Sequence, residues 1–245
     1  MYESTWPYEG VPVGSQVVLY DDFITPITAH TADAAVMNSA VPWNFSIVNS
    51  STLTDVNVAG ATGCARITNG NADDDDSDLA SALCFYAACE PTIEVRAANN
   101  DVDQLAHCIG FSDAISEGAN TIAFTYSLAA LTSTATDGAC FLHDPDATTD
   151  AIYCVSVNND TDGTTTTSGS AAADGTFNTY RIHIDSAGNA YFYLDGSLVY
   201  TEALAVATSA ILCAYVAVIE HPSAGAAEDT FDIDYIRVWA KRKTS

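Results

Sequence analysis

Paired carboxylates are the groups with which this sequence could do chemistry, because it has 32 acidic residues. A retaining glycosidase needs two carboxylates about 5–5.5 Å apart, and on a strand that requires acids two or four residues apart on one face. Glu90 and Glu94 have such a spacing, but a proline follows Glu90 and no aspartate lies between them. Asp232 and Asp234 share a face without a glutamate beside them. The pattern Glu-x-Asp-x-x-Glu is absent, so we expect a protein that is not an enzyme.

Other catalytic patterns are equally scarce. The sequence has neither a Gly-x-Ser-x-Gly nucleophile turn nor a glycine-rich phosphate loop. Its histidines do not stand two or four residues from one another, so we interpret each as a surface or hydrogen-bonded structural residue. They are His30, His107, His143, His183 and His221. We therefore assign no catalytic residue.

Two acidic segments offer oxygen ligands of the kind that calcium prefers. One is "DTDG" at residues 160–163, and the other contains Asp144, Asp146 and Asp150. Neither has the spacing of an EF-hand, and the alternative is a solvated acidic loop. We expect no metal site and no cofactor, with calcium as the one ion that these loops could hold. The run "NGNADDDDSD", from Asn69 to Asp78, is interpreted as a surface loop.

Tyr191 and Tyr193 stand two residues apart in a candidate strand, so their rings share one face. An open face with two tyrosines could stack a sugar ring and would be a glycan-binding site. A covered face would make both tyrosines part of the core, which is the interpretation that we favour.

Composition excludes several partners. The formal charge is -25, with only 7 lysines and arginines, and such a surface repels nucleic acid and anionic membranes. Seven cysteines are present, most of them inside apolar runs and none in a C-x-x-C motif. We expect free thiols in a reducing cytosol, and the alternative is one or two disulfides. The first residues have neither a basic segment nor an apolar run, so no signal peptide is expected.

The elements that would position these residues are strands. Residues 180–204 alternate polar and apolar side chains around an Asp195-Gly196 turn, which predicts a three-stranded antiparallel meander. Similar runs recur at intervals of about 10–15 residues, as in an antiparallel sandwich. Long segments show no helical periodicity, and residues 128–131 could form a helical turn at most. We predict one domain over residues 16–240.

The two ends of the chain differ from this body. Residues 1–15 read as an arm carrying Trp6 and Tyr8, and residues 241–245 form a basic tail. The tail could be solvated, or it could dock on an acidic neighbour. Its basic residues are Lys241, Arg242 and Lys243.

"GNAYFYLDGSLVY" and the final "DTFDIDYIRVWA" resemble the late strands of the concanavalin A-like lectin/glucanase superfamily, and "LYDDF" at residues 19–23 is similar to its opening strand. The resemblance implies an all-β, two-sheet antiparallel jelly-roll sandwich. The catalytic motif of the glucanases and the metal ligands of the legume lectins are not found here. "TIEVRA", "IGFSDA" and "DYIRVWAKR" are also similar to accessory proteins of tailed-phage virions.

This second likeness implies a non-enzymatic structural protein that decorates a phage capsid. Its partners would be the major capsid protein or other virion proteins, and it would form a homo-oligomer. It would assemble in the host cytoplasm and lie on the capsid exterior. The residues expected to anchor it are Trp6, Tyr8, Lys241, Arg242 and Lys243. The alternatives are a carbohydrate-binding module displayed for host attachment, with Tyr191 and Tyr193 as glycan-binding residues, and a divergent glycoside hydrolase.

Overall fold

The structure is a computed structural model of the 245-residue chain. It describes residues 16–23, 36–37, 43–47, 51–61, 63–70, 72, 74–118, 120–221 and 229–242. Of residues 36–37 only the backbone is described.

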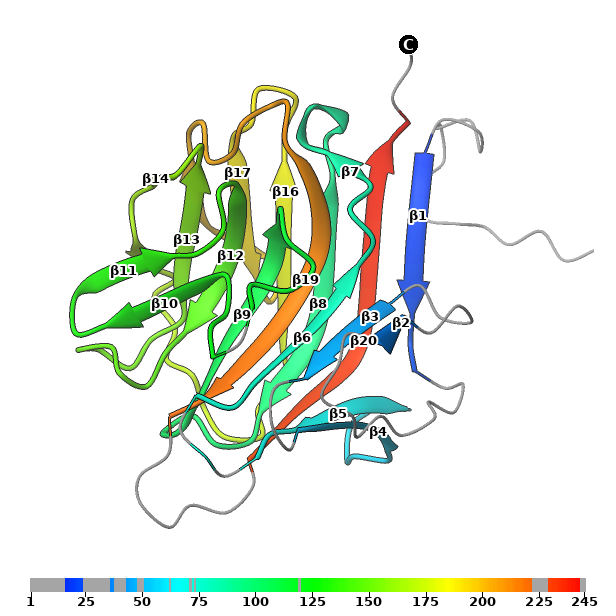
Figure 1. The fold of residues 1–245 in the computed structure, drawn as a ribbon, viewed down its shortest axis with the longest axis vertical. Coiled ribbons are helices and arrows are strands. Elements are labelled where there is room, and N and C mark those ends of the chain that lie inside the picture. The colour runs from blue at the N-terminus through cyan, green and yellow to red at the C-terminus, as the bar shows by residue number, and fades with distance from the viewer. Residues whose placement is uncertain are drawn as a thin grey trace, which may run out of the picture.

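Two large antiparallel sheets make up the molecule (Figure 1). The first has eight strands. Their order across the sheet is β18 (Ser197–Glu202), β17 (Ala190–Leu194), β16 (Asn178–Ile184), β8 (Thr92–Asn99), β20 (Thr230–Lys241), β5 (Cys64–Thr68) and β4 (Thr52–Val56), and β1 (Gln16–Asp21) pairs with β20.

The second sheet has ten strands. Its main order is β14 (Thr161–Asp162), β13 (Tyr153–Asn158), β12 (Gly138–His143), β9 (Leu105–Ser112), β19 (Ile211–Glu220), β6 (Asp76–Ser81), β3 (Trp43–Ile47) and β2 (Val36–Met37). Two short strands pair at its side: β15 (Thr166–Thr167) with β13, and β7 (Phe85–Tyr86) with β19. A separate hairpin is formed by β10 (Phe124–Ser127) and β11 (Ala130–Ser133).

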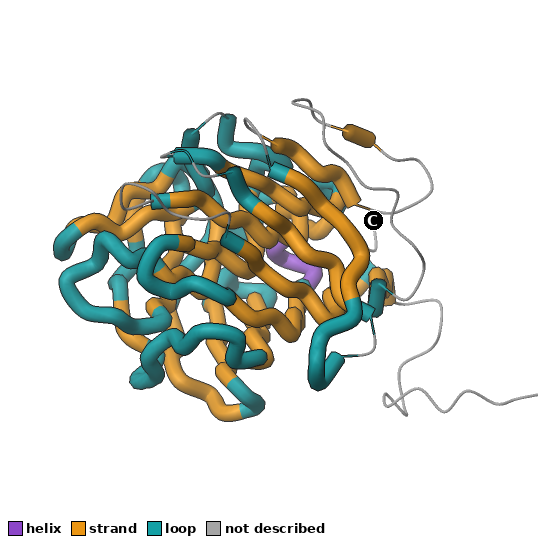
Figure 2. The backbone as a smooth tube through the Cα atoms, turned by 90° about the horizontal axis from the view of Figure 1, so that it is seen from below, coloured by secondary structure: helices purple, strands orange, loops and turns teal. Residues whose placement is uncertain are grey.

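Alternating apolar residues of both sheets point inward and form one core between them. Buried members from the eight-stranded sheet include Ile93, Val95 and Ile236, and those from the ten-stranded sheet include Ile109 and Phe141. In Figure 2 the strands fill most of the molecule, and the purple segment is the short 3₁₀ helix η1 (Ala87–Cys89). The all-β, two-sheet antiparallel sandwich predicted from the sequence is confirmed.

A second apolar layer covers the outer face of the ten-stranded sheet. Ile122 and Phe124 pack there against residues of the sheet such as Leu142, Val155 and Tyr215. The covering residues come from the loop after β9 and from the β10–β11 hairpin, which lies in front of the sheet in Figure 1. This sheet is therefore buried on both faces over the area of that layer.

Of two local structures predicted from the sequence, one is confirmed and one is wrong. The meander of residues 180–204 is confirmed as β16, β17 and β18, and Asp195 and Gly196 have φ angles of 49° and 80°. Positive φ at both central residues is what a type I′ hairpin turn requires. The helical turn at residues 128–131 is wrong, because Leu128 adopts φ 57° at the tip of the β10–β11 hairpin. Among the helices of the described residues, none has the length and apolarity needed to cross a bilayer.

Candidate binding face on the eight-stranded sheet

All five arginines of the chain, together with Lys241, lie on the eight-stranded sheet or directly after its strand β20. Arg66, Arg96, Arg181 and Arg237 occupy positions whose sequence neighbours point into the core, so their own side chains point outward. Within the described residues, the ten-stranded sheet and its covering layer carry no lysine or arginine. The lysines and arginines of the described residues thus lie on the outer face of the eight-stranded sheet or at the end of β20.

Carboxylates accompany these cations. Arg66 donates through Nε and Nη2 to the two carboxylate oxygens of Asp232, at 2.6 and 2.8 Å. Arg96 pairs with Asp234 at 2.5 Å. The remaining pairs are Arg181 with Glu94 at 3.9 Å and Lys241 with Glu90 at 2.5 Å. These pairs make the outer face close to neutral, in contrast to the chain as a whole.

Two rows of outward side chains cross six strands of this face. Directly paired residues place Tyr20, Arg237, Glu94, Arg181, Tyr193 and Leu198 in the first row. The second row contains Val18, Trp239, Thr92, His183, Tyr191 and Thr201. Directly opposite side chains in a sheet are in contact range, so each row is a continuous surface.

Aromatic rings in these rows are held by their neighbours. The Arg181 guanidinium lies 4.2 Å from the centre of the Tyr193 ring, and the Arg237 guanidinium lies 4.7 Å from the Trp239 ring. His183 stacks on Tyr191, with ring centres 5.8 Å apart. Such contacts fix the rings in position and give the face a rigid surface.

Our expectation that Tyr191 and Tyr193 belong to the core is wrong. Both side chains are half-buried on the outer face, and neither joins a core cluster. The Tyr191 hydroxyl donates to Asp185 at 3.1 Å, and this hydrogen bond raises the pKa of Tyr191.

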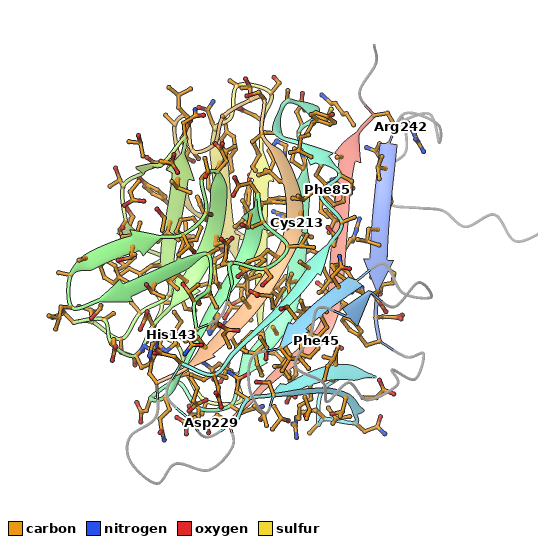
Figure 3. The ribbon with its side chains drawn as sticks, viewed as in Figure 1. Phe45, Phe85, His143, Cys213, Asp229 and Arg242 are labelled. Atoms are coloured by element: carbon orange, nitrogen blue, oxygen red, sulfur yellow. The ribbon has the colours of Figure 1, made fainter. Side chains whose placement is uncertain are left out.

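The two ends of the described chain meet at one corner of this sheet. Gln16, where β1 begins, pairs with Lys241, where β20 ends, and Figure 1 shows both at the same edge of the molecule. Arg242 follows there (Figure 3). A cavity of about 420 Å³ lies at this corner and is lined by Tyr86, Ala88, Cys89, Thr208, Ser209, Lys241 and Arg242. The other expected anchoring residues, Trp6, Tyr8 and Lys243, lie outside the described residues.

The outer face of the ten-stranded sheet holds acids of a different kind. Asp76 and Asp78 point into the covering layer from β6 and are fully buried. The surface loop expected over residues 69–78 is therefore wrong at both of its ends, because Asn69 and residues 75–78 are buried. Asp78 accepts a hydrogen bond from the Tyr215 hydroxyl, and Asp76 accepts one from the Thr121 amide. One oxygen of each carboxylate has no hydrogen-bond partner. Burial raises the pKa of Asp76 to about 6 and that of Asp78 to about 7.

Of the residues considered for calcium, Asp144 and Asp146 lie together and Asp150 and the 160–163 segment lie apart from them. Asp144, Asp146 and His221 offer ligand atoms within 4.8 Å of one another. Asp150 instead lies 3.8 Å from His143, and Asp162 accepts from Ser133.

Glu220, next to His221, is fully buried, and burial together with Asp229 raises its pKa. Asp229 and His143 mark this end of the molecule in Figure 3.

Two histidines that are far apart in the sequence are adjacent in the fold. His107 and His143 are paired across β9 and β12, with ring centres 5.4 Å apart, and both are buried. His143 donates to the Val102 carbonyl at 2.8 Å. Burial lowers the pKa of His107 well below its usual value. Both are hydrogen-bonded structural residues, as the sequence predicts for its histidines.

Neither the arginine-bearing face nor the buried acids were predicted from the sequence. A signal for the first was present, because "CARIT", "TIEVRA", "YRIHID" and "DYIRVW" each carry one arginine at a polar position of an alternating strand. The Asp-Ser-Asp spacing before Leu79 and Ala80 was a weaker signal that Asp76 and Asp78 share a strand face.

No family model and no curated protein matches this chain. Solved structures do match. The carbohydrate recognition domain of Emp47p is 10% identical, with 94% of this chain and 99% of that chain covered and a TM-score of 0.56. The endo-β-1,4-glucuronan lyase from the fungus Trichoderma reesei is 11% identical, with 90% and 94% covered and a TM-score of 0.55.

A phage protein is also similar. The carbohydrate esterase vb_24B_21 from the Shiga toxin-encoding bacteriophage phi24B is 15% identical, with 83% of this chain and 92% of that chain covered and a TM-score of 0.50. At such identities the likeness concerns the fold. The chain has the concanavalin A-like jelly-roll fold. Recognition domains and enzymes share that fold here, so the fold alone does not decide activity.

Proposed function

We propose that this protein is a non-enzymatic structural protein that decorates a larger assembly, held at the corner where its two terminal segments leave the sandwich. The observation that carries the proposal is the pairing of Gln16 with Lys241. The point where the 1–15 arm joins β1 therefore lies beside the point where the basic tail leaves β20, so that both segments can engage one neighbouring surface. The motif likeness described above makes the exterior of a phage virion the preferred assembly.

The placement of charges and acids supports a binding role over catalysis. Lys241 and Arg242 line the corner cavity. Lys241 pairs there with Glu90, and Arg242 adds a further positive charge toward an acidic partner. On the outer face of the ten-stranded sheet, Asp76 and Asp78 share a strand face but are sealed beneath the loop after β9. A carboxylate pair that no substrate can reach does not serve hydrolysis.

Truncation and charge reversal test the anchoring corner. Particles assembled with the full chain are compared with those assembled with a chain lacking residues 1–15, and with a chain carrying Lys241→Glu and Arg242→Glu. Incorporation is measured by co-sedimentation in a density gradient, and we expect each change to lower it by about tenfold or more. Leu128→Glu, at an exposed position on the covered side, is the control. Normal loading of both altered chains would overturn the proposal.

Carbohydrate binding is the second candidate. It is favoured by the position of Tyr191 and Tyr193 at the surface of β17, beside Asp185 and His183 as polar neighbours. The recognition domain of Emp47p also has this fold. The Arg181 guanidinium and the His183 ring, however, already occupy one face of the Tyr193 and Tyr191 rings, respectively. A glycan array should show binding that Tyr191→Ala and Tyr193→Ala remove, and silence across the array counts against this candidate.

A further inference from the structure

The outer face of the eight-stranded sheet differs electrostatically from every other described surface. Arg66, Arg96, Arg181 and Lys241 each pair with a carboxylate there. The loops at the other faces carry acids such as Asp103, Asp146 and Asp160, with no lysine or arginine among their described residues. With a total charge of -25, two copies of this chain repel each other in most orientations. The neutral face is where that repulsion is smallest.

The same face has the composition of an interface core. Tyrosine, tryptophan and arginine are enriched at the centres of protein interfaces, and Tyr193, Trp239 and Arg237 stand in its two rows. Apolar side chains line its two margins. Val18 and Tyr20 on β1 are each 50% exposed, and Leu198 on β18 is 53% exposed.

Its size and charge order suit a second copy of itself. Six strands spaced by about 4.8 Å give a width of roughly 24 Å, and a seven-residue strand such as β16 is about 23 Å long, so the face spans roughly 550 Å². That area approaches the roughly 800 Å² per partner of a standard interface. In the first row Glu94 stands between Arg237 and Arg181. This charge order is self-complementary, because a two-fold axis between Glu94 and Arg181 sets each of these two side chains against the other one in the second copy.

We propose that two copies of this chain dimerise through the outer faces of their eight-stranded sheets. This inference does not depend on the proposed function. It commits to a two-fold, face-to-face arrangement in which the acidic faces of both copies remain exposed. The dimer presents two terminal corners, one from each copy.

The test is sedimentation velocity of the full chain from about 1 to about 100 μM, a range set by ordinary weak to moderate dimer affinities. We expect a concentration-dependent dimer. Raising the salt from about 0.02 M to about 0.5 M should tighten it by about tenfold, because salt screens the repulsion between the two acidic bodies. Weakening by salt would mean that attraction between unlike charges holds the dimer, and would overturn this account of its electrostatics.

Two substitutions locate the surface. Leu198→Glu and Arg181→Glu each add negative charge to the face, and we expect at least a tenfold weaker dimer in both. Leu198 is half-exposed, so Leu198→Glu should keep the fold intact. It therefore still tests the surface if Arg181→Glu unfolds the protein. Leu128→Glu, at a side chain that is 73% exposed on the other side of the molecule, should leave association unchanged. A chain that stays monomeric at every concentration, or a dimer that survives both face substitutions, overturns the proposal.

Discussion

On the outer face of the eight-stranded sheet Asp232 and Asp234 meet arginines, whereas on the outer face of the ten-stranded sheet Asp76 and Asp78 meet none. Both pairs sit two residues apart on a strand. Asp232 is as fully buried as Asp78, yet only Asp78 lacks a cation. The two faces therefore use different means to hold a buried carboxyl group: an opposite charge on one and a bound proton on the other.

The proton on Asp78 gives the largest effect that we predict. Burial raises the pKa of Asp78 to about 7, so the native state keeps a proton that the unfolded chain releases near its usual value of about 4. The free energy of unfolding is therefore highest below about pH 4 and falls as the pH rises to about 7. This residue accounts for a loss of about 4 kcal/mol. Asp76, with a pKa raised to about 6, adds a loss of the same sign.

Urea unfolding from pH 4 to pH 8 measures this slope, with Asp78→Asn as the comparison. The variant keeps an oxygen for the Tyr215 hydroxyl but cannot ionise. The slope of its unfolding free energy against pH should therefore be smaller, by the amount that corresponds to about one bound proton. A wild-type protein that becomes more stable between pH 4 and pH 7 would contradict the sign. An unchanged slope in the variant would assign the dependence to other carboxyl groups.

The covering layer gives the next effect. Phe124 is fully buried between that layer and the sheet, so Phe124→Ala should cost about 3 kcal/mol of unfolding free energy. It should also raise binding of an apolar dye, because the acids and apolar residues beneath the layer become accessible. Leu128→Ala, at the exposed tip of the same hairpin, is the matched control and should change stability by less than about 0.5 kcal/mol. Equal effects of the two would mean that the hairpin is not packed on the sheet.

The contrast between the faces also marks the limit of what the sequence predicts. Period-two alternation finds strands wherever one face is polar, which is why "YRIHID" was correctly predicted as a strand with polar and apolar side chains on opposite faces. It fails at β6, because a run of aspartates reads as a solvated loop until another segment is known to cover it. That covering segment lies 45 residues beyond Asp76, at Thr121, and no local pattern links the two.

The candidate binding face was out of reach for a related reason. Each arginine could be placed on a strand, but the rows depend on which strands are neighbours. The order β1, β20, β8, β16 and β17 joins the two ends of the sequence to its middle. Alternation within one strand carries no information about that order, so Tyr20, Arg237 and Tyr193 could not be brought together from the sequence.

The smallest effect that we predict comes from breaking one ion pair on the open face. Arg66→Ala leaves the buried Asp232 carboxylate with Asn100 as its remaining side-chain donor, at 2.9 Å. The loss should be about 2 kcal/mol, below the range for fully buried pairs because the Arg66 side chain is 31% exposed. Arg66→Lys should lose part of this, since an ammonium group cannot donate to both oxygens as the guanidinium does. Replacing both partners, with Arg66→Met and Asp232→Leu, should return stability close to that of the wild type. Urea midpoints at pH 7 distinguish the two single variants and the double variant. A double variant as unstable as Arg66→Ala would mean that the stability of this face requires the ion pair itself, and not only the absence of an unpaired carboxylate.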